Sequence, residues 1–287
     1  MVFPFKILKV WRLIILLFFP SLSLFLLEKT EEIFKNKIMK NITHKSNDGS
    51  TTSLRIYTPN SINYFRAESF STKEPETLEW IDKYGKDKIF YDVGANIGLY
   101  SLYFSKKHLR HSYAFEPSVF NLECLARNIN INNLQDLITI MPFALSEKTL
   151  ESKFYLSSFE MGSAHSTFDK KIGHDGLILN SKFEYLTVGF ALDFLVNNLT
   201  IQPPGLIKID VDGIEDLVLL GAQNVLTSPN LISVLVEVND DYTLLSRAVT
   251  TMLLHSGFVL KEKRQSEMFV NSIYSNSYNQ IWSKNEF

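Results

Sequence analysis

The chain has 287 residues, of which 45% are hydrophobic and 21% charged, with a formal net charge of −2. This composition is ordinary for a globular protein, and the near-neutral charge argues against a nucleic-acid-binding surface. The single cysteine, Cys124, excludes an internal disulfide framework. Its place in a helical pattern predicts a small, buried apolar side chain.

The N-terminus departs from this average composition. Residues 13–27 carry no charge, and Lys6, Lys9 and Arg12 precede them. A helix over these residues reaches only about 22 Å, against a hydrocarbon core of roughly 30 Å, so it is short for a simple span. We expect residues 7–27 to associate with a membrane surface or bilayer. A cleaved signal peptide and a hydrophobic helix buried against the domain or a partner are the alternatives.

We divide the chain into three parts, which are a membrane-associating segment (1–27), a polar stem (28–53) and one folded domain (54–287). At the start of the domain, short β-like runs are expected between Leu54 and Phe70. Glu74 and Pro75 then predict the start of a helix that continues through Ile81.

From residue 88 onward, apolar β-prone runs alternate with helical runs. The expected strands of this alternation are 88–93, 112–115, 137–143, 206–211 and 231–238. The expected helices are 99–107, 118–130, 191–198, 214–226 and 240–256. Further strands are expected at 151–156 and 183–188, around a long loop, and β segments from Gly257 through Ile281. This repetition predicts an α/β domain whose parallel sheet is covered on both faces.

The turn after the first of these strands is the strongest functional signal. Asp92, Gly94, Asn96 and Gly98 form the pattern Asp-x-Gly-x-Asn-x-Gly between a strand and a helix. Glycines there allow a ligand to touch the backbone, and open α/β sheets bind nucleotide-like ligands at such turns. Because the pattern lacks the dinucleotide signature Gly-x-Gly-x-x-Gly, it indicates S-adenosylmethionine (SAM) rather than NAD.

Glu116 strengthens this interpretation. It ends the next expected strand, 24 residues after Asp92. An acidic residue at about this spacing accepts hydrogen bonds from ribose hydroxyls. A carboxylate at this position is compatible with SAM, which has a positive sulfonium and no phosphate that the carboxylate would repel. A solvated carboxylate at the end of a strand is the alternative.

Lys208 and Asp210 are the next candidates. They alternate with Ile207, Ile209 and Val211, so both polar side chains lie on one face at the end of a buried strand. Burying a lysine and an aspartate is costly unless they pair or act chemically. A structural ion pair and a catalytic role both remain open.

Glu237 and His165 complete the candidate catalytic residues. Glu237 ends the strand next to that of Lys208, where it suits a general base or a partner for that lysine. His165 lies in a loop that could cover a methyl acceptor or face solvent. Asp210 and Asp212 without further ligands do not indicate a metal site. An alcohol acceptor must lose a proton, and we order the candidate bases as Asp210, Glu237, Lys208 and His165.

Three stretches carry a resemblance to a known family, namely Tyr91–Tyr100, Ala114–Pro117 and Ile207–Glu215, and the segment 74–81 adds to it. Together they resemble the FkbM family of SAM-dependent methyltransferases over about residues 54–283. The resemblance implies the Rossmann-like, seven-stranded class I methyltransferase sheet with an antiparallel last strand. It also implies methyl transfer from SAM, usually to an oxygen of a sugar, glycan or other small molecule.

The resemblance also assigns site residues. It places the methionine part of SAM at Asp92, Gly94, Asn96 and Gly98, the ribose at Glu116, and the adenine at Ala144. The family pattern of the third stretch is matched at Lys208, Asp210 and Glu215. Asp212 and Ile214 depart from that pattern, which bears on the acceptor side.

We therefore expect a membrane-associated methyltransferase whose catalytic domain is cytoplasmic, because SAM is supplied in the cytosol. Its acceptor is expected to be a glycan or related small molecule. The rival interpretations are an inactive SAM-binding scaffold and, with less support, an NAD-dependent oxidoreductase.

Overall fold

The computed structural model describes residues 38–199, 201–272 and 274–284. The chain divides into two units, 1–40 and 41–287, and the description that follows concerns the second. The membrane-associating segment expected at residues 7–27 lies outside the described residues. Within the described ranges, no helix is both long and apolar enough to cross a membrane.

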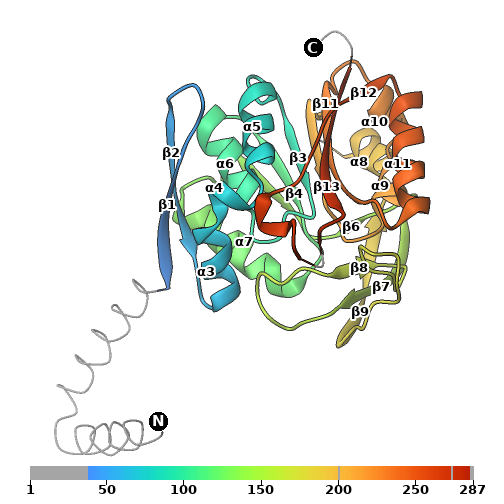
Figure 1. The fold of residues 1–287 in the computed structure, drawn as a ribbon, viewed down its shortest axis with the longest axis horizontal. Coiled ribbons are helices and arrows are strands. Elements are labelled where there is room, and N and C mark those ends of the chain that lie inside the picture. Colours follow the sequence, from blue (N-terminus) through green and yellow to red (C-terminus); the bar gives the residue numbers. More distant parts are fainter. Residues whose placement is uncertain (1–37, 200, 273, 285–287) are drawn as a thin grey trace, which may run out of the picture. The chain divides into compact units, whose positions relative to one another are not determined.

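A seven-stranded sheet forms the centre of the domain, with the strand order β12-β13-β11-β10-β3-β4-β5 (Figure 1). Its strands are β3 (Phe90–Val93), β4 (Ser112–Phe115), β5 (Ile138–Met141), β10 (Leu206–Ile209), β11 (Ser233–Asn239), β12 (Phe258–Arg264) and β13 (Ser277–Lys284). β13 runs antiparallel to both of its neighbours, whereas β5, β4, β3, β10 and β11 pair in parallel. The expected class I methyltransferase sheet, with its antiparallel last strand, is confirmed.

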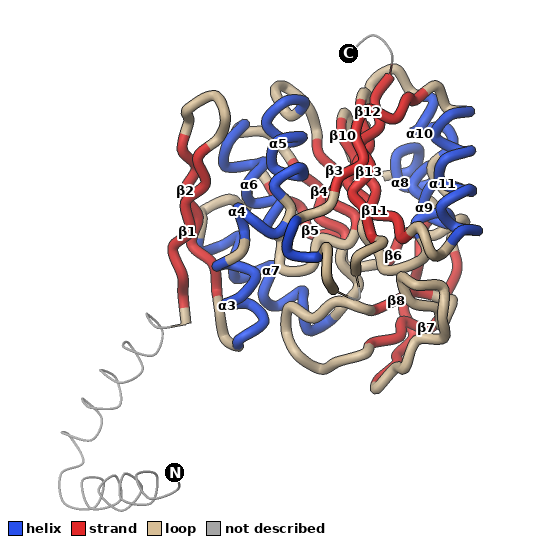
Figure 2. The backbone as a smooth tube through the Cα atoms, viewed as in Figure 1, coloured by secondary structure: helices blue, strands red, loops and turns tan. Residues whose placement is uncertain are grey.

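Helices cover both faces of this sheet (Figures 1 and 2). One face carries α5 (Pro75–Tyr84), α6 (Leu99–His108) and α7 (Val119–Ile131). The other carries α8 (Leu192–Asn198), α9 (Glu215–Leu220), α10 (Gln223–Thr227) and α11 (Thr243–His255). Successive residues of β3 alternate between these layers, since Phe90 packs in the first apolar cluster and Tyr91 and Val93 in the second. Cys124 is fully buried in the first layer, as predicted.

The strands expected at 151–156 and 183–188 belong to a separate, four-stranded sheet of order β6-β9-β7-β8. Its strands are β6 (Ala144–Leu145), β7 (Leu150–Leu156), β8 (Ser166–Phe168) and β9 (Phe183–Phe190). Residues 157–165 and 169–182 are the loops that join β7, β8 and β9. These loops supply walls of the cavity described below.

Two expectations about regular structure are wrong. The β-like runs expected from Leu54 to Phe70 continue only through β2 (Thr51–Tyr57), after which α3 (Ser61–Glu68) and α4 (Phe70–Lys73) follow. Asn60 starts α3 because its side chain accepts a hydrogen bond from the amide of Asn63. The helix expected over 214–226 is interrupted at Gly221, where a Cβ would lie 2.1 Å from the Ser146 carbonyl oxygen.

The segment expected to be a stem contains a strand at its end. β1 (Met39–Lys45) forms a two-stranded sheet with β2, and Ile42 belongs to the first apolar cluster. A short 3-10 helix, η1 (Glu267–Phe269), lies between β12 and β13.

Two asparagines, Asn128 within α7 and Asn132 at its C-terminal end, form the hydrogen bonds to β2 that a neighbouring strand would otherwise form. The Asn128 side chain accepts a hydrogen bond from the Tyr57 amide at 2.7 Å and donates to the Ile97 carbonyl at 2.8 Å. The Asn132 side chain accepts from the Arg55 amide at 2.9 Å and donates to its carbonyl at 2.8 Å. Buried amide side chains here satisfy backbone groups that would otherwise lose their hydrogen bonds.

We expect Asn128→Ala to lower the free energy of unfolding by about 2 kcal/mol, because it leaves the Tyr57 amide and the Ile97 carbonyl without partners. Urea unfolding at constant pH measures the loss. Asn130→Ala on the same helix is the control, since Asn130 is exposed, and it should change the value by less than about 0.5 kcal/mol. Equal stability of the two variants would contradict the role given to Asn128.

Candidate functional site

Two adjoining cavities open at the carboxyl ends of β3, β4 and β10. The larger has a volume of about 440 Å³ and the smaller about 60 Å³. The residues that line both are Gly94, Asn96, Ser163, Ala164, Asp210 and Asp212. The glycine turn and the loop after β10 therefore lie where the two cavities meet.

The glycine turn needs its glycines. Gly94 has a φ of +82°, and a Cβ there would lie 1.9 Å from the Asp210 carbonyl oxygen. Gly98 has a φ of +85°, and its Cβ would lie 2.3 Å from Leu125 Cδ1. Asn96 also adopts a positive φ, of 52°. The turn is thus held against the loop after β10 on one side and against α7 on the other.

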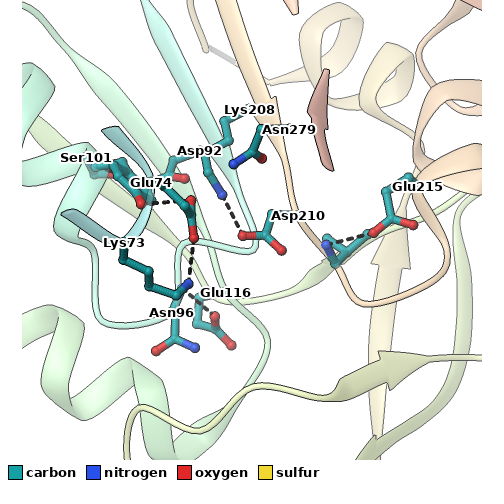
Figure 3. Close-up of polar contacts among 12 residues, drawn as sticks. Lys73, Glu74, Asp92, Asn96, Ser101, Glu116, Lys208, Asp210, Glu215 and Asn279 are labelled. Atoms are coloured by element: carbon teal, nitrogen blue, oxygen red, sulfur yellow. Dashed lines mark hydrogen bonds and ion pairs between the residues drawn. The ribbon is translucent and has the colours of Figure 1, made fainter. Parts of the chain in front are cut away.

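Asp92 lies beneath the turn. Its carboxylate is fully buried and accepts hydrogen bonds from the Ser101 amide at 3.0 Å and hydroxyl at 2.7 Å, which caps the start of α6 (Figure 3). Burial raises the pKa of this carboxyl, while the positive charge of Lys208 and the bonds from Ser101 oppose the rise. In the described part of the chain, Asp92 Oδ1 has no hydrogen-bond partner. Neither Asp92 nor Gly98 lines the two cavities.

Glu116 stands at the end of β4 and lines the smaller cavity together with Ala144 and Phe143. Its carboxylate accepts hydrogen bonds from the amides of Asn96 and Ser118, each at 2.7 Å (Figure 3). Burial raises its pKa to about 7 in spite of these bonds. The structure thus brings Glu116, Ala144 and the turn residues Gly94 and Asn96 together at one cavity, although their roles stay a prediction.

Lys208, Asp210 and Glu237 form a group of ionisable side chains at the larger cavity, in which Lys208 is buried and Asp210 and Glu237 are partly exposed. Lys208 is 1% exposed, and its Nζ lies 2.7 Å from Asp210 Oδ2 (Figure 3). Burial opposes the charge of Lys208, but Asp210, Glu74 and Asp92 raise its pKa overall. Burial opposes the charge of Asp210 likewise, and Lys208 and a hydrogen bond with Glu237 lower its pKa overall.

Glu237 lies beside Asp210 in this group. Burial and the neighbouring Asp210 raise the pKa of Glu237 well above its usual range. The raised pKa favours the protonated Glu237 carboxyl as the donor in its hydrogen bond with Asp210, and Lys208 Nζ donates to the same carboxylate. Among the four candidate bases, the pKa values of Lys208 and Glu237 are thus raised and that of Asp210 is lowered.

Lys73, Glu74 and Tyr100 were not among the predicted site residues, yet they line the larger cavity beside Lys208. Glu74 accepts a hydrogen bond from Lys73 Nζ (Figure 3) and a second from the Tyr100 hydroxyl at 2.8 Å. Lys208 Nζ lies 5.0 Å from the centre of the Tyr100 ring. Glu74 did carry a signal, because it belongs to the stretch 74–81 that resembles the FkbM family, but nothing within that stretch marks its carboxylate as a site residue.

His165 belongs to a second polar group in the larger cavity. Its amide donates to Asp212 Oδ2 at 2.8 Å, and its Nε2 lies 2.8 Å from the Tyr274 hydroxyl. The His165 and Tyr274 rings stack with their centres 5.6 Å apart, and the His174 ring lies 5.1 Å from His165. Among the described residues, no three His, Cys, Asp or Glu side chains are arranged to hold a metal ion. Tyr274 was missed because no local pattern marks it.

Glu215 lies outside both cavities and has a structural role. Its Oε1 accepts hydrogen bonds from the amides of Val211 at 3.1 Å and Gly213 at 3.2 Å, which holds the loop after β10 (Figure 3). Burial raises its pKa to about 8. The conformation of the loop that carries Asp212 therefore depends on a carboxyl that is mostly protonated at neutral pH.

The chain is similar to known methyltransferases in sequence and in fold. Residues 92–260 match the family model described as the methyltransferase FkbM domain. The solved structure of methyltransferase FkbM from Methylobacillus flagellatus KT is 15% identical, with a TM-score of 0.45. That alignment covers 69% of this chain and 44% of the other, so this chain spans less than half of that relative. No curated protein matches the chain.

Two further solved structures are similar. Precorrin-6y C5,15-methyltransferase from Geobacter metallireducens GS-15 is 11% identical over 73% of this chain and 86% of that chain, with a TM-score of 0.43. TrmK of M. capricolum, in complex with S-adenosyl-homocysteine, is 13% identical over 72% of this chain and 67% of that chain, with a TM-score of 0.39.

The raised pKa of Glu215 generates a prediction about stability. A folded-state pKa of about 8 means that the folded protein keeps a proton that the unfolded chain has lost above pH 4.5. Stability is therefore greatest at low pH for this group and falls as the pH rises towards 8. The amide oxygen of Glu215→Gln can accept the same two hydrogen bonds but does not titrate. Between pH 6 and pH 8 we therefore expect the free energy of unfolding of this variant to fall by about 2 kcal/mol less than that of the unchanged protein.

Urea unfolding at the two pH values measures this difference. Glu147→Gln is the control, because Glu147 is exposed beside Lys148, and it should leave the pH dependence unchanged. If Glu215→Gln and the unchanged protein lose the same stability between pH 6 and pH 8, Glu215 is not protonated in the fold.

Proposed function

The chain belongs to the FkbM methyltransferase family, and we propose that it transfers the methyl group of SAM to an oxygen of a sugar, glycan or related small-molecule acceptor. The observation that carries the proposal is the meeting of Glu116 with the glycine turn at the junction of two cavities. The residues that line the smaller cavity suit the nucleoside of a methyl donor, and only the larger cavity, of about 440 Å³, has the volume of a typical ligand site.

The residues at the smaller cavity fit the adenosine part of SAM. Glu116 offers carboxylate oxygens to ribose hydroxyls, and Phe143 and Ala144 line the apolar wall next to it. A side chain at Gly94 would collide with the Asp210 backbone, so glycine there lets the loop after β10 pack directly against the turn that lines both cavities. When bound, SAM supplies an electrophilic methyl group, and its sulfur keeps the electron pair of the broken C–S bond as the acceptor oxygen takes the methyl carbon.

The charged group around Asp210 suits a cationic donor. Asp210 lines both cavities and stays ionised, because Lys208 and the Glu237 hydrogen bond lower its pKa overall. A fixed negative charge attracts a sulfonium, and its placement needs no rearrangement during the reaction. We therefore assign to Asp210 the positioning of the donor, with Lys208 and Glu237 keeping its charge and orientation.

We further propose that the acceptor is found at a membrane and that the catalytic domain works on the cytoplasmic side. This part of the proposal is supported only by the sequence, in which basic residues precede the uncharged residues 13–27. A lipid-linked glycan precursor would combine a sugar hydroxyl with that location.

SAM binding tests the donor site. We expect Glu116→Gln to weaken the affinity for SAM by about 10-fold to 100-fold, because the amide offers one acceptor oxygen where the carboxylate offers two. Isothermal titration calorimetry with SAM measures the change. Glu123→Gln on α7 is the matched control, since Glu123 is solvent-exposed and paired with Arg127. Unchanged affinity in Glu116→Gln would sink the donor-site assignment.

The acceptor is tested by mass spectrometry of glycans and lipids from cells with and without the protein. We expect one methyl group on a sugar hydroxyl to disappear from a membrane-bound glycan when the protein is absent. Loss of a methyl group from a soluble molecule alone would remove the membrane part of the proposal. SAM binding with no change in any methylated molecule would favour the rival interpretation of an inactive scaffold.

A further inference from the structure

We propose that Tyr274 and His165, oriented by Asp212, form a relay that takes the proton from the acceptor hydroxyl. The inference rests on the proposed function and adds the acceptor side of the same site. All three residues line the larger cavity, which also contains Asp210.

The three residues come from segments far apart in the chain. His165 ends the loop between β7 and β8, Asp212 follows β10, and Tyr274 lies between η1 and β13. His165 Nε2 lies 2.8 Å from the Tyr274 hydroxyl, and His165 Nδ1 lies 3.8 Å from Asp212 Oδ1. The two rings are nearly parallel, with an angle of 5° between their planes. Because of these contacts, His165 differs from a histidine on a solvent-exposed loop.

The backbone holds this arrangement at a conformational cost. His165 and Asp212 have positive φ values of 61° and 62°, which non-glycine residues adopt only at the expense of about 1–3 kcal/mol each. Asp212 Oδ2 accepts hydrogen bonds from the amides of His165 at 2.8 Å and Ser166 at 3.2 Å. Gly213 packs against the next loop, because a Cβ there would lie 2.5 Å from the Gly173 carbonyl oxygen. Strain of this kind, kept in place by side-chain hydrogen bonds, is characteristic of functional sites.

The position of Asp212 decides which ring nitrogen of His165 carries the proton. A carboxylate near Nδ1 favours a proton there, so Nε2 is the free acceptor and receives the hydrogen bond of the Tyr274 hydroxyl. The phenol oxygen then has lone pairs left for a second hydroxyl. An acceptor O–H that donates to this oxygen passes its proton to Tyr274 as the proton of Tyr274 moves to His165 Nε2. The net result is an acceptor oxygen without its proton and an imidazolium beside Asp212.

The surrounding charges support this direction of transfer. His165 is faced by Asp212, Tyr274 and His174, and burial together with His165 itself lowers the pKa of His174, which favours the neutral form of that ring. Burial and Asp212 raise the pKa of Tyr274, while Lys73 opposes the rise and Glu237 adds to it. The phenol therefore keeps a proton at rest and acts only as a carrier. The His165 side chain is 33% exposed, which lets the imidazolium return its proton to water.

The first test reads the state of His165 in the ligand-free protein, by NMR of its ring nitrogens. We expect the proton on Nδ1 in the unchanged protein, a shift towards Nε2 in Asp212→Asn, and a changed Nε2 signal in Tyr274→Phe. His255→Gln, at an exposed histidine of α11, should leave the His165 signals unchanged. A proton on Nε2 in the unchanged protein, or no response to either variant, would overturn the relay.

The second test follows methyl transfer from tritium-labelled SAM to a pool of glycolipids extracted from membranes. We expect His165→Gln and Tyr274→Phe to slow transfer at least 100-fold while their calorimetric SAM affinity stays within threefold. The pH dependence of the rate should follow the NMR titration of His165 and flatten in His165→Gln. Normal rates in these variants would refute the relay, whereas failure of the unchanged protein to bind SAM would refute the proposed function instead.

Discussion

The site depends on the burial of one ammonium group at the end of β10. Lys208 is 1% exposed and stands directly beside Asp92 in the parallel ladder between β10 and β3. A buried charge without a partner costs several kcal/mol, so the surrounding residues must supply negative charge. Asp210 does so by direct contact, and Glu74 and Asp92 do so from neighbouring positions. The carboxylates that gather at the mouth of the crevice are therefore required by the fold before any ligand binds.

This requirement links the proposed donor site to the sheet. Asp210 faces Lys208 with its side chain, and its carbonyl oxygen occupies the space that a Cβ of Gly94 would need. A change in the ion pair would therefore move the loop against the glycine turn. The turn also depends on Glu116, whose carboxylate accepts the Asn96 amide. Charge balance, backbone contact and ligand geometry are thus coupled within a few residues.

The positions of site residues at strand ends could be predicted from local sequence patterns. Alternation placed Lys208 and Asp210 on one face, and the spacing from Asp92 placed Glu116 at the next strand end, because parallel strands align their carboxyl ends. Tyr274 and Lys73 could not be found this way, since tertiary contacts alone bring them to the cavity. The prediction of further β structure after β2 was wrong for a similar reason. α3 is short, and one of its buried residues is the polar Asn63, so its sequence lacks the apolar stripe that marks a helix.

The two sides of the crevice differ in what holds them. Gly94, Glu116 and Asp210 sit at or next to strand ends, where the ladder sets their positions and backbone atoms surround them. His165 and Tyr274 sit on connecting segments, and their positions depend on a few side-chain hydrogen bonds such as those to Asp212. Loops tolerate substitution better than the strands they join. Within this chain, the geometry of the proposed donor site is therefore more constrained than the geometry of the proposed acceptor site. Features that identify the donor, such as the glycine turn, carry little information about the molecule that is methylated.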